Sequence, residues 1–272
     1  MVKCRLCGTD KIEKSFIASN YHGRHYWGQK KFQLYHCQKC GCYFLDKIEN
    51  QKDYYRKYYP KKYSAKATRM DEIFLFFKKK LINQHFAGQQ KISILDIGCG
   101  NGSFLKNLDN NHYEKYGVEL KQEFTDKMIN LIIGDFNKIK LNKKFDCITL
   151  WHVLEHLPQP QKTLIKIKKL LKNNGLLLMT MPNSDSLGFK LGRKYFFHLD
   201  SPRHLFIPNS TNISRILKKT GFRQIAVSYP FYDYPLDLFW SVRKSSWRFL
   251  IYPFYPLFKL FSRETMLISA RK

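Results

Sequence analysis

The sequence is poor in acidic residues and has no long apolar run. Its 272 residues include 21 Asp and Glu against 48 Lys and Arg, a formal net charge of +27. This excess fits either solvated basic faces or attraction to a polyanion or an anionic membrane surface. No uncharged apolar stretch approaches the roughly 20 residues that span a bilayer, and the N-terminus lacks an apolar signal core. These absences predict a cytoplasmic protein whose cysteines are reduced unless they bind metal.

Residues 94–102 carry the most informative pattern, an apolar run followed by alternate glycines: Gly98, Gly100 and Gly102. The pattern predicts a buried strand that turns sharply into a helix, with backbone N–H groups beside a ligand. The dinucleotide fingerprint is absent, because Ser103 stands where its third glycine is required. Asp96 would also repel a pyrophosphate. A ligand with a cationic amino-acid end therefore fits better.

Other residues follow predicted strands at the spacing of a βα fold. Glu119 ends the segment 115–119, and a carboxylate there can accept both ribose hydroxyls of a nucleoside. Asp135 and Phe136 follow the next apolar segment, and Trp151 follows the one after that. Since the carboxyl ends of parallel strands meet at one edge of a sheet, we expect these side chains to surround one ligand.

The segment Leu-Asp-Ile-Gly-Cys-Gly-Asn-Gly at 95–102 resembles the first motif of class I S-adenosylmethionine-dependent methyltransferases. The resemblance covers roughly residues 68–272. It implies an α/β fold, Rossmann-like, in which a seven-stranded, mostly parallel sheet has helices on both faces. In the family, the Asp at the third strand tip contacts the adenine amino group and its neighbour packs on the ring. The implied residues for S-adenosylmethionine are Asp96, Gly98, Gly100, Gly102, Glu119, Asp135, Phe136 and Trp151.

Four of the seven cysteines form two Cys-x-x-Cys pairs, each followed by a glycine. Two such pairs can present four thiolates to one zinc ion, which predicts a small zinc-ribbon-like module over residues 1–49. His36 and Cys42 are possible substitutes for one ligand, and the alternative to a metal site is a set of reduced structural cysteines. The predicted zinc ligands are Cys4, Cys7, Cys37 and Cys40.

The chain divides further into a connector at 50–67 and a methyltransferase domain at 68–272. Within that domain, the insertion at 229–261 holds 13 aromatic residues among its 33, with arginines and lysines in it and at its edges. Aromatic residues with flanking cations suit a segment that lies in a membrane interface. A lid over the site or a dimer contact is the alternative.

Methyl transfer to an alcohol also requires a base that removes the hydroxyl proton. His152 and His156 follow the fourth predicted strand, and His204 lies in a long loop at 183–208 that could close over the acceptor. His198 lies in the same loop, and we predict that one of these four histidines is the base. The alternative for each is a structural histidine. Arg203 could bind a phosphate or carboxylate of the acceptor, or cap a helix.

The whole chain resembles bacterial methyltransferases that are often associated with polysaccharide and glycolipid biosynthesis. DNA and RNA amino-methylating enzymes carry Asn/Asp-Pro-Pro-aromatic after the fourth strand, where this chain has Leu150-Trp-His-Val. The resemblance therefore favours O-methylation of a small-molecule, sugar or lipid-linked acceptor. One alternative is an RNA-modifying enzyme that holds RNA with its zinc module. Another is a non-catalytic cofactor-binding scaffold. The sequence indicates no oligomeric state.

Overall fold

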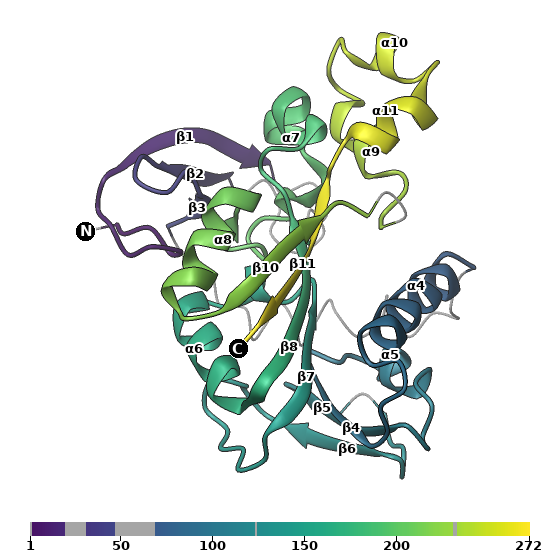
Figure 1. The fold of residues 1–272 in the computed structure, drawn as a ribbon. Helices are drawn as coiled ribbons and strands as arrows, with labels where there is room; N and C mark the ends of the chain where they lie inside the picture. Colours follow the sequence, from purple (N-terminus) through teal and green to yellow (C-terminus); the bar gives the residue numbers. More distant parts are fainter. Residues whose placement is uncertain (1, 20–30, 47–68, 123, 231–232) are drawn as a thin grey trace.

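The computed structural model describes residues 2–19, 31–46, 69–122, 124–230 and 233–272. A seven-stranded sheet forms its centre, in the order β10-β11-β8-β7-β4-β5-β6 (Figure 1). The five strands from β4 to β8 pair in parallel, and β11 is antiparallel to both of its neighbours. The prediction of a mostly parallel sheet is confirmed. The strands are β4 (Ile92–Ile97), β5 (Tyr113–Glu119), β6 (Ile129–Ile133), β7 (Phe145–Trp151), β8 (Leu171–Pro182), β10 (Arg223–Ser228) and β11 (Thr265–Arg271).

Helices cover both faces of this sheet, as the resemblance implied. In Figure 1, α4 (Arg69–His85) and α5 (Ser103–Lys106) lie on one face, and α6 (Pro160–Leu170) and α8 (Ser210–Lys219) lie on the other. All six residues of β4 are buried, because β4 is a central strand with both faces covered. Because β4 to β8 are parallel, their carboxyl ends lie along one edge of the sheet. The predicted cofactor residues lie at or just after these strand ends.

A second, four-stranded sheet has the order β1-β2-β3-β9. It joins β1 (Ile12–Ser19), β2 (Lys31–Cys37) and β3 (Tyr43–Leu45) from the N-terminal region to β9 (Phe206–Ile207). Phe44 pairs with Phe206, and both side chains are fully buried. The cysteine-rich segment therefore shares both a sheet and a hydrophobic core with the later part of the chain.

The region at 183–208 contains more regular structure than the loop that we expected. It holds α7 (Leu187–Gly192), the short 3-10 helices η2 (Arg193–Tyr195) and η3 (Phe197–Leu199), and β9. These pieces are too short to produce a helical or alternating pattern in the sequence. They are fixed by burial instead, since Phe189, Phe196 and Leu199 belong to one core cluster with the N-terminal sheet.

The insertion at 229–261 forms three short helices at one end of the molecule (Figure 1): α9 (Asp237–Val242), α10 (Arg248–Ile251) and α11 (Tyr255–Phe261). They pack on α7 through Leu238, Val242 and Ile251, which are buried. None of the helices that the structure describes is long and apolar enough to cross a bilayer. The connector at 50–67 lies outside the described residues.

Candidate functional site

The turn after β4 requires glycine for two reasons. Gly98, Gly100 and Gly102 all have positive φ angles, of +72°, +55° and +74°. A Cβ atom on Gly98 would also stand 2.7 Å from a methyl carbon of Val153, which follows β7. The carboxylate of Glu119, at the end of β5, accepts hydrogen bonds from the backbone N–H groups of Gly100 at 2.9 Å and Leu120 at 2.8 Å. The turn and the β5 carboxylate thus form one unit.

Asp96 lies in β4 beside this turn and is buried. Its burial raises the pKa to about 7, although the hydroxyl of Thr149 donates a hydrogen bond to it at 2.7 Å. The positive charge of Lys78, on α4, also opposes the rise. A cationic ligand group at this point would favour the charged form of Asp96.

The remaining predicted cofactor residues lie in different surroundings. Asp135 follows β6 with a half-exposed carboxylate that accepts from the N–H of Asn137 at 2.9 Å. Trp151 ends β7 and packs edge-on against Phe104, with ring centroids 5.3 Å apart. Phe136 is buried in the main hydrophobic core. Its stacking on an adenine ring stays a prediction, with little exposed ring surface to support it.

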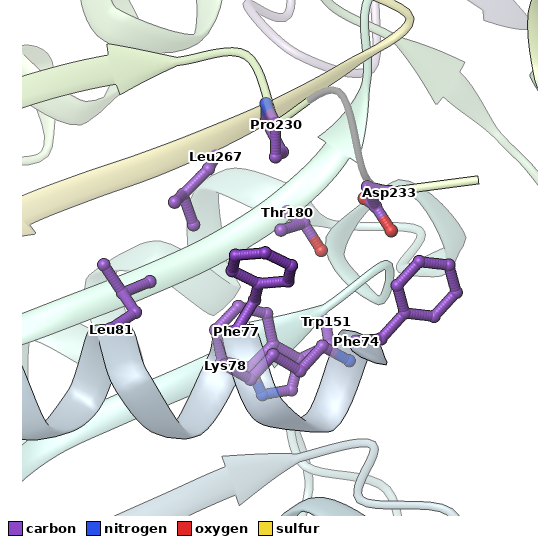
Figure 2. Close-up of a pocket in the computed structure, with 9 residues that line it drawn as sticks. All are labelled: Phe74, Phe77, Lys78, Leu81, Trp151, Thr180, Pro230, Asp233 and Leu267. Carbon is purple, nitrogen blue, oxygen red and sulfur yellow. The ribbon is translucent and has the colours of Figure 1, made fainter. Parts of the chain in front are cut away.

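Figure 2 shows a pocket between α4 and the ends of β7 and β8. In the wall of this pocket, the ammonium of Lys78 lies 4.9 Å from the ring centroid of Trp151. Lys78 and Asp233 are site residues that we did not expect from the sequence. In the sequence, Lys78 is marked only as a lysine on the apolar face of a predicted helix. Asp233 is marked only as an acidic residue near the start of the aromatic insertion. The pocket is lined by Phe74, Phe77, Lys78, Leu81, Trp151, Thr180, Pro230, Asp233 and Leu267.

His152 stands just past β7 with a positive φ of 55°. Its Nε2 lies 2.8 Å from a carboxylate oxygen of Asp233, and its Nδ1 lies 3.4 Å from the carboxylate of Glu155. Burial opposes a charge on this imidazole, but the two carboxylates outweigh it and raise the pKa of His152 to about 9. His152 is therefore protonated at neutral pH and is poorly suited to be the predicted base.

A second buried ion-pair chain comes from the same insertion. Nε2 of His198 lies 3.1 Å from Asp237, whose other oxygen accepts from the ammonium of Lys259 at 2.7 Å. The rings of His198 and His152 are nearly parallel, with centroids 6.3 Å apart. Tyr234 packs edge-on against both of them. Charged residues of the insertion thus contact histidines at and near the end of β7.

His156 and His204 lie together, with ring centroids 4.6 Å apart. Nδ1 of His156 donates to the carbonyl of Arg203 at 3.1 Å, and Nδ1 of His204 donates to the carbonyl of His198 at 2.6 Å. Because a carbonyl can only accept, each Nε2 keeps its lone pair. Burial lowers the pKa of His156 to about 4 and that of His204 well below its usual value. Both imidazoles are uncharged at neutral pH.

The four predicted zinc ligands gather into one cluster. Their sulfur atoms all lie within 4.8 Å of one another, with Sγ–Sγ distances of 3.7 Å for Cys4 and Cys40 and 3.6 Å for Cys7 and Cys37. Zn–S bonds of about 2.3 Å at tetrahedral angles require sulfur separations of about 3.8 Å, so the cluster fits a zinc ion. Neither suggested substitute belongs to the cluster. Sγ of Cys42 donates to the carbonyl of Ile207, and His36 is bound to Glu13.

We expect Asp233→Asn to lower the pKa of His152 by about one unit or more, as measured by NMR of its ring protons. A raised folded-state pKa stabilises the fold fully below the unfolded pKa of about 6.5, and this stabilisation is lost as pH rises through about 9. The variant should therefore lose up to about 3 kcal/mol of unfolding free energy near pH 6, and progressively less in alkaline solution.

The control for this prediction is Asp109→Asn. Asp109 pairs with His112 at 2.6 Å at the surface, where solvent screens the pair, so the unfolding free energy of this variant should stay close to that of the wild type. A wild-type His152 that titrates near its ordinary pKa would contradict the ion pair.

Comparison with known proteins agrees with the fold described above. The family model described as a methyltransferase domain matches residues 61–227. A ubiquinone biosynthesis O-methyltransferase from Glaesserella parasuis is 29% identical over 126 residues, which are 40% of this chain and 53% of that protein. This chain spans about half to two thirds of the length of the curated relatives that it matches.

Solved structures share the fold. An S-adenosylmethionine-dependent methyltransferase from Archaeoglobus fulgidus has a TM-score of 0.53 at 19% identity, over 82% of this chain and 100% of its own. Phosphoethanolamine N-methyltransferase 2 of Haemonchus contortus, solved with S-adenosyl-L-methionine, has a TM-score of 0.56 at 17% identity, over 99% of this chain and 71% of its own. Because the family match covers more than half of the 272 residues, the chain belongs to the methyltransferase-domain family.

Proposed function

We propose that this enzyme transfers the methyl group of S-adenosylmethionine to a hydroxyl oxygen of a lipid-linked or membrane-proximal acceptor at an anionic membrane surface. The observation that carries the proposal is the double role of the insertion at 229–261. One part of it supplies Asp233 to His152, just past β7, and Asp237 to His198 in η3. Another part exposes large apolar side chains at the end of the molecule.

The donor side of the site is the edge formed by β4, β5 and β6. Glu119 and the glycine turn would hold the ribose, Asp135 the adenine, and Asp96 the cationic amino-acid end. The carboxylate of Glu119 accepts hydrogen bonds from the backbone N–H groups of Gly100 and Leu120, which hold it beside the glycine turn where the ribose would lie. The acceleration would come from holding the acceptor oxygen in line with the methyl group.

We expect Glu119→Ala to weaken S-adenosylmethionine binding by roughly 1–3 kcal/mol in calorimetry, because a charge-assisted contact pair is lost. Glu114→Ala is the matched control. Glu114 lies on the same strand but pairs at the surface with Lys143 at 2.6 Å, so the variant should bind the donor as the wild type does. Binding of a nicotinamide dinucleotide in place of S-adenosylmethionine would contradict the donor assignment.

Hydroxyl methylation requires that the acceptor proton leave. Among the predicted bases, His156 and His204 each keep an uncharged Nε2, whereas His152 is held protonated. Relatives named as ubiquinone biosynthesis O-methyltransferases support oxygen as the methylated atom. The identity of the base among the histidines stays a prediction.

The membrane contact is proposed for the outer surface of α9, α10 and α11. Two phenylalanines there are each 71% exposed, and burying one such ring stabilises binding by about 1.5–3 kcal/mol. Cations accompany the rings, since the guanidinium of Arg248 lies 4.6 Å from the ring centroid of Phe249. Nearby cations add about 1 kcal/mol each on an anionic membrane. The exposed apolar residues are Leu236, Trp240, Trp247, Phe249, Leu250, Phe254, Leu257, Leu260 and Phe261.

We expect the full chain to float with phosphatidylglycerol-containing vesicles, and Phe249→Ser combined with Phe261→Ser to lower the partition coefficient by about tenfold or more per ring. Phe76→Ser is the matched control, because Phe76 is 60% exposed on α4, outside the insertion. Donor binding should be unchanged in each variant. If the wild type does not float even at low salt, the insertion is a lid or an oligomer contact, and a soluble acceptor becomes the better hypothesis.

We also propose that the four-cysteine cluster holds a structural zinc ion. All four cysteines are used as ligands and no position stays open, which is typical of structural zinc. The ion would connect the turns at Gly8 and Gly41, whose φ angles are +77° and +78°. It would thereby fix the N-terminal sheet that β9 completes.

We expect Cys37→Ser to remove one equivalent of zinc from the purified chain, as measured by elemental analysis, because three thiolates bind the ion far more weakly. Cys42→Ser is the control and should keep the zinc, since Cys42 stands outside the cluster. A folded wild-type N-terminal segment without zinc would reject the assignment.

A further inference from the structure

A second group of metal-ligating side chains lies away from the cysteines. Glu155 and His156 belong to η1 (Leu154–His156), just after β7, and His204 comes from the segment before β9. One ligand atom from each of the three side chains lies within 4.8 Å of the others. The backbone joins the two segments as well, because the N–H of Leu205 donates to the carbonyl of Glu155 at 2.8 Å.

The two imidazoles are already oriented as metal ligands. Each donates a hydrogen bond from its Nδ1–H to a backbone carbonyl, at 3.1 Å for His156 and 2.6 Å for His204. Such a bond fixes the ring and its tautomer, and leaves the Nε2 lone pair for the metal. Nε2 of His204 lies 4.0 Å from Glu155, so small rotations would bring both atoms to one ion.

Glu155 is the stronger indication. Its side chain is fully buried, and neither carboxylate oxygen has a hydrogen-bond partner among the described residues. The closest counter-charge is Nδ1 of His152, at 3.4 Å from Oε1. A buried carboxylate with this little compensation is costly, and a bound cation would remove the cost.

We propose that Glu155, His156 and His204 bind a divalent transition-metal ion such as zinc, at a site separate from the four-cysteine cluster. Two imidazoles and one carboxylate suit zinc, cobalt and ferrous iron. Three protein ligands leave a position open for an oxygen atom of a bound molecule. His156 is half-buried, unlike the other two ligands, so the site is accessible from its side.

Nearby positive charges do not prevent this binding. The guanidinium of Arg203, on the residue before His204, forms an ion pair with Asp200. His152 shares its charge with Asp233 at 2.8 Å, and contacts only Oε1 of Glu155. Oε1 of Glu155 faces both His152 and His204, whereas Oε2 has no hydrogen-bond partner among the described residues, so a rotation of the carboxylate can present Oε2 to the ion.

The inference rests on the geometry of the cluster and does not depend on the acceptor proposed above. A metal ion would occupy the Nε2 lone pairs that a histidine base would use, so the two roles exclude each other. In O-methylation the ion would instead acidify a bound hydroxyl. The site can be tested without any measurement of methyl transfer.

The experiment is a titration of the reduced, metal-free full chain with Co²⁺, followed by absorption spectroscopy. Cobalt in the cysteine cluster gives sulfur-to-cobalt charge-transfer bands in the near ultraviolet. Cobalt in the Glu–His site gives no such bands and only weaker bands in the visible range. We expect the wild type to bind one equivalent at each site. His204→Gln and Glu155→Gln should each lose the cobalt ion of the Glu–His site, which gives no sulfur bands. Each should keep the cobalt ion of the cysteine cluster.

His112→Gln, which removes an exposed surface imidazole, is the matched control and should bind cobalt as the wild type does. S-adenosylmethionine binding verifies the fold of each variant, and His156→Gln replaces any variant that does not fold. A wild type that binds cobalt with sulfur bands only would overturn the proposal. Unchanged cobalt binding in the folded ligand variants would overturn it too.

Discussion

The buried ion pair between His152 and Asp233 is the interaction on which the arrangement of the site depends. It ties the insertion at 229–261 to the end of β7, next to the strand that carries the glycine turn. Without it, two buried charges would each lose the nearest opposite charge. With it, the rest of the insertion can extend outward and expose its aromatic rings. One buried contact thus links the chemistry of the strand ends to the outer surface of the molecule.

The sequence predicted the features that are local. An apolar run followed by glycines defines β4 and its turn. The spacing of the later apolar segments placed Glu119 and Asp135 at strand ends. The paired cysteines predicted their own cluster, because two short turns present all four sulfurs. In each case the information lies within a few residues, and the parallel sheet brings the separate strand ends to one edge.

The remaining features depend on contacts between distant segments. β9 is only two residues long, and pairing with β3 determines it, so no pattern in residues 183–208 could predict it. The burial of Phe136 in the main core is another such feature, because a strand-tip motif does not fix which way a ring turns. Lys78 and Asp233 become site residues only when α4 and the insertion meet at the pocket. The pKa values of the histidines likewise come from partners far away in sequence.

The most direct test of this account is a crystal structure of the chain with S-adenosylhomocysteine. The account predicts the ribose hydroxyls on the carboxylate of Glu119 and the sulfur atom toward Trp151 and His152. The acceptor side, between His152 and the segment that contains His204, should then stay open. A product bound away from the glycine turn, or one whose ribose makes no contact with Glu119, would contradict the account.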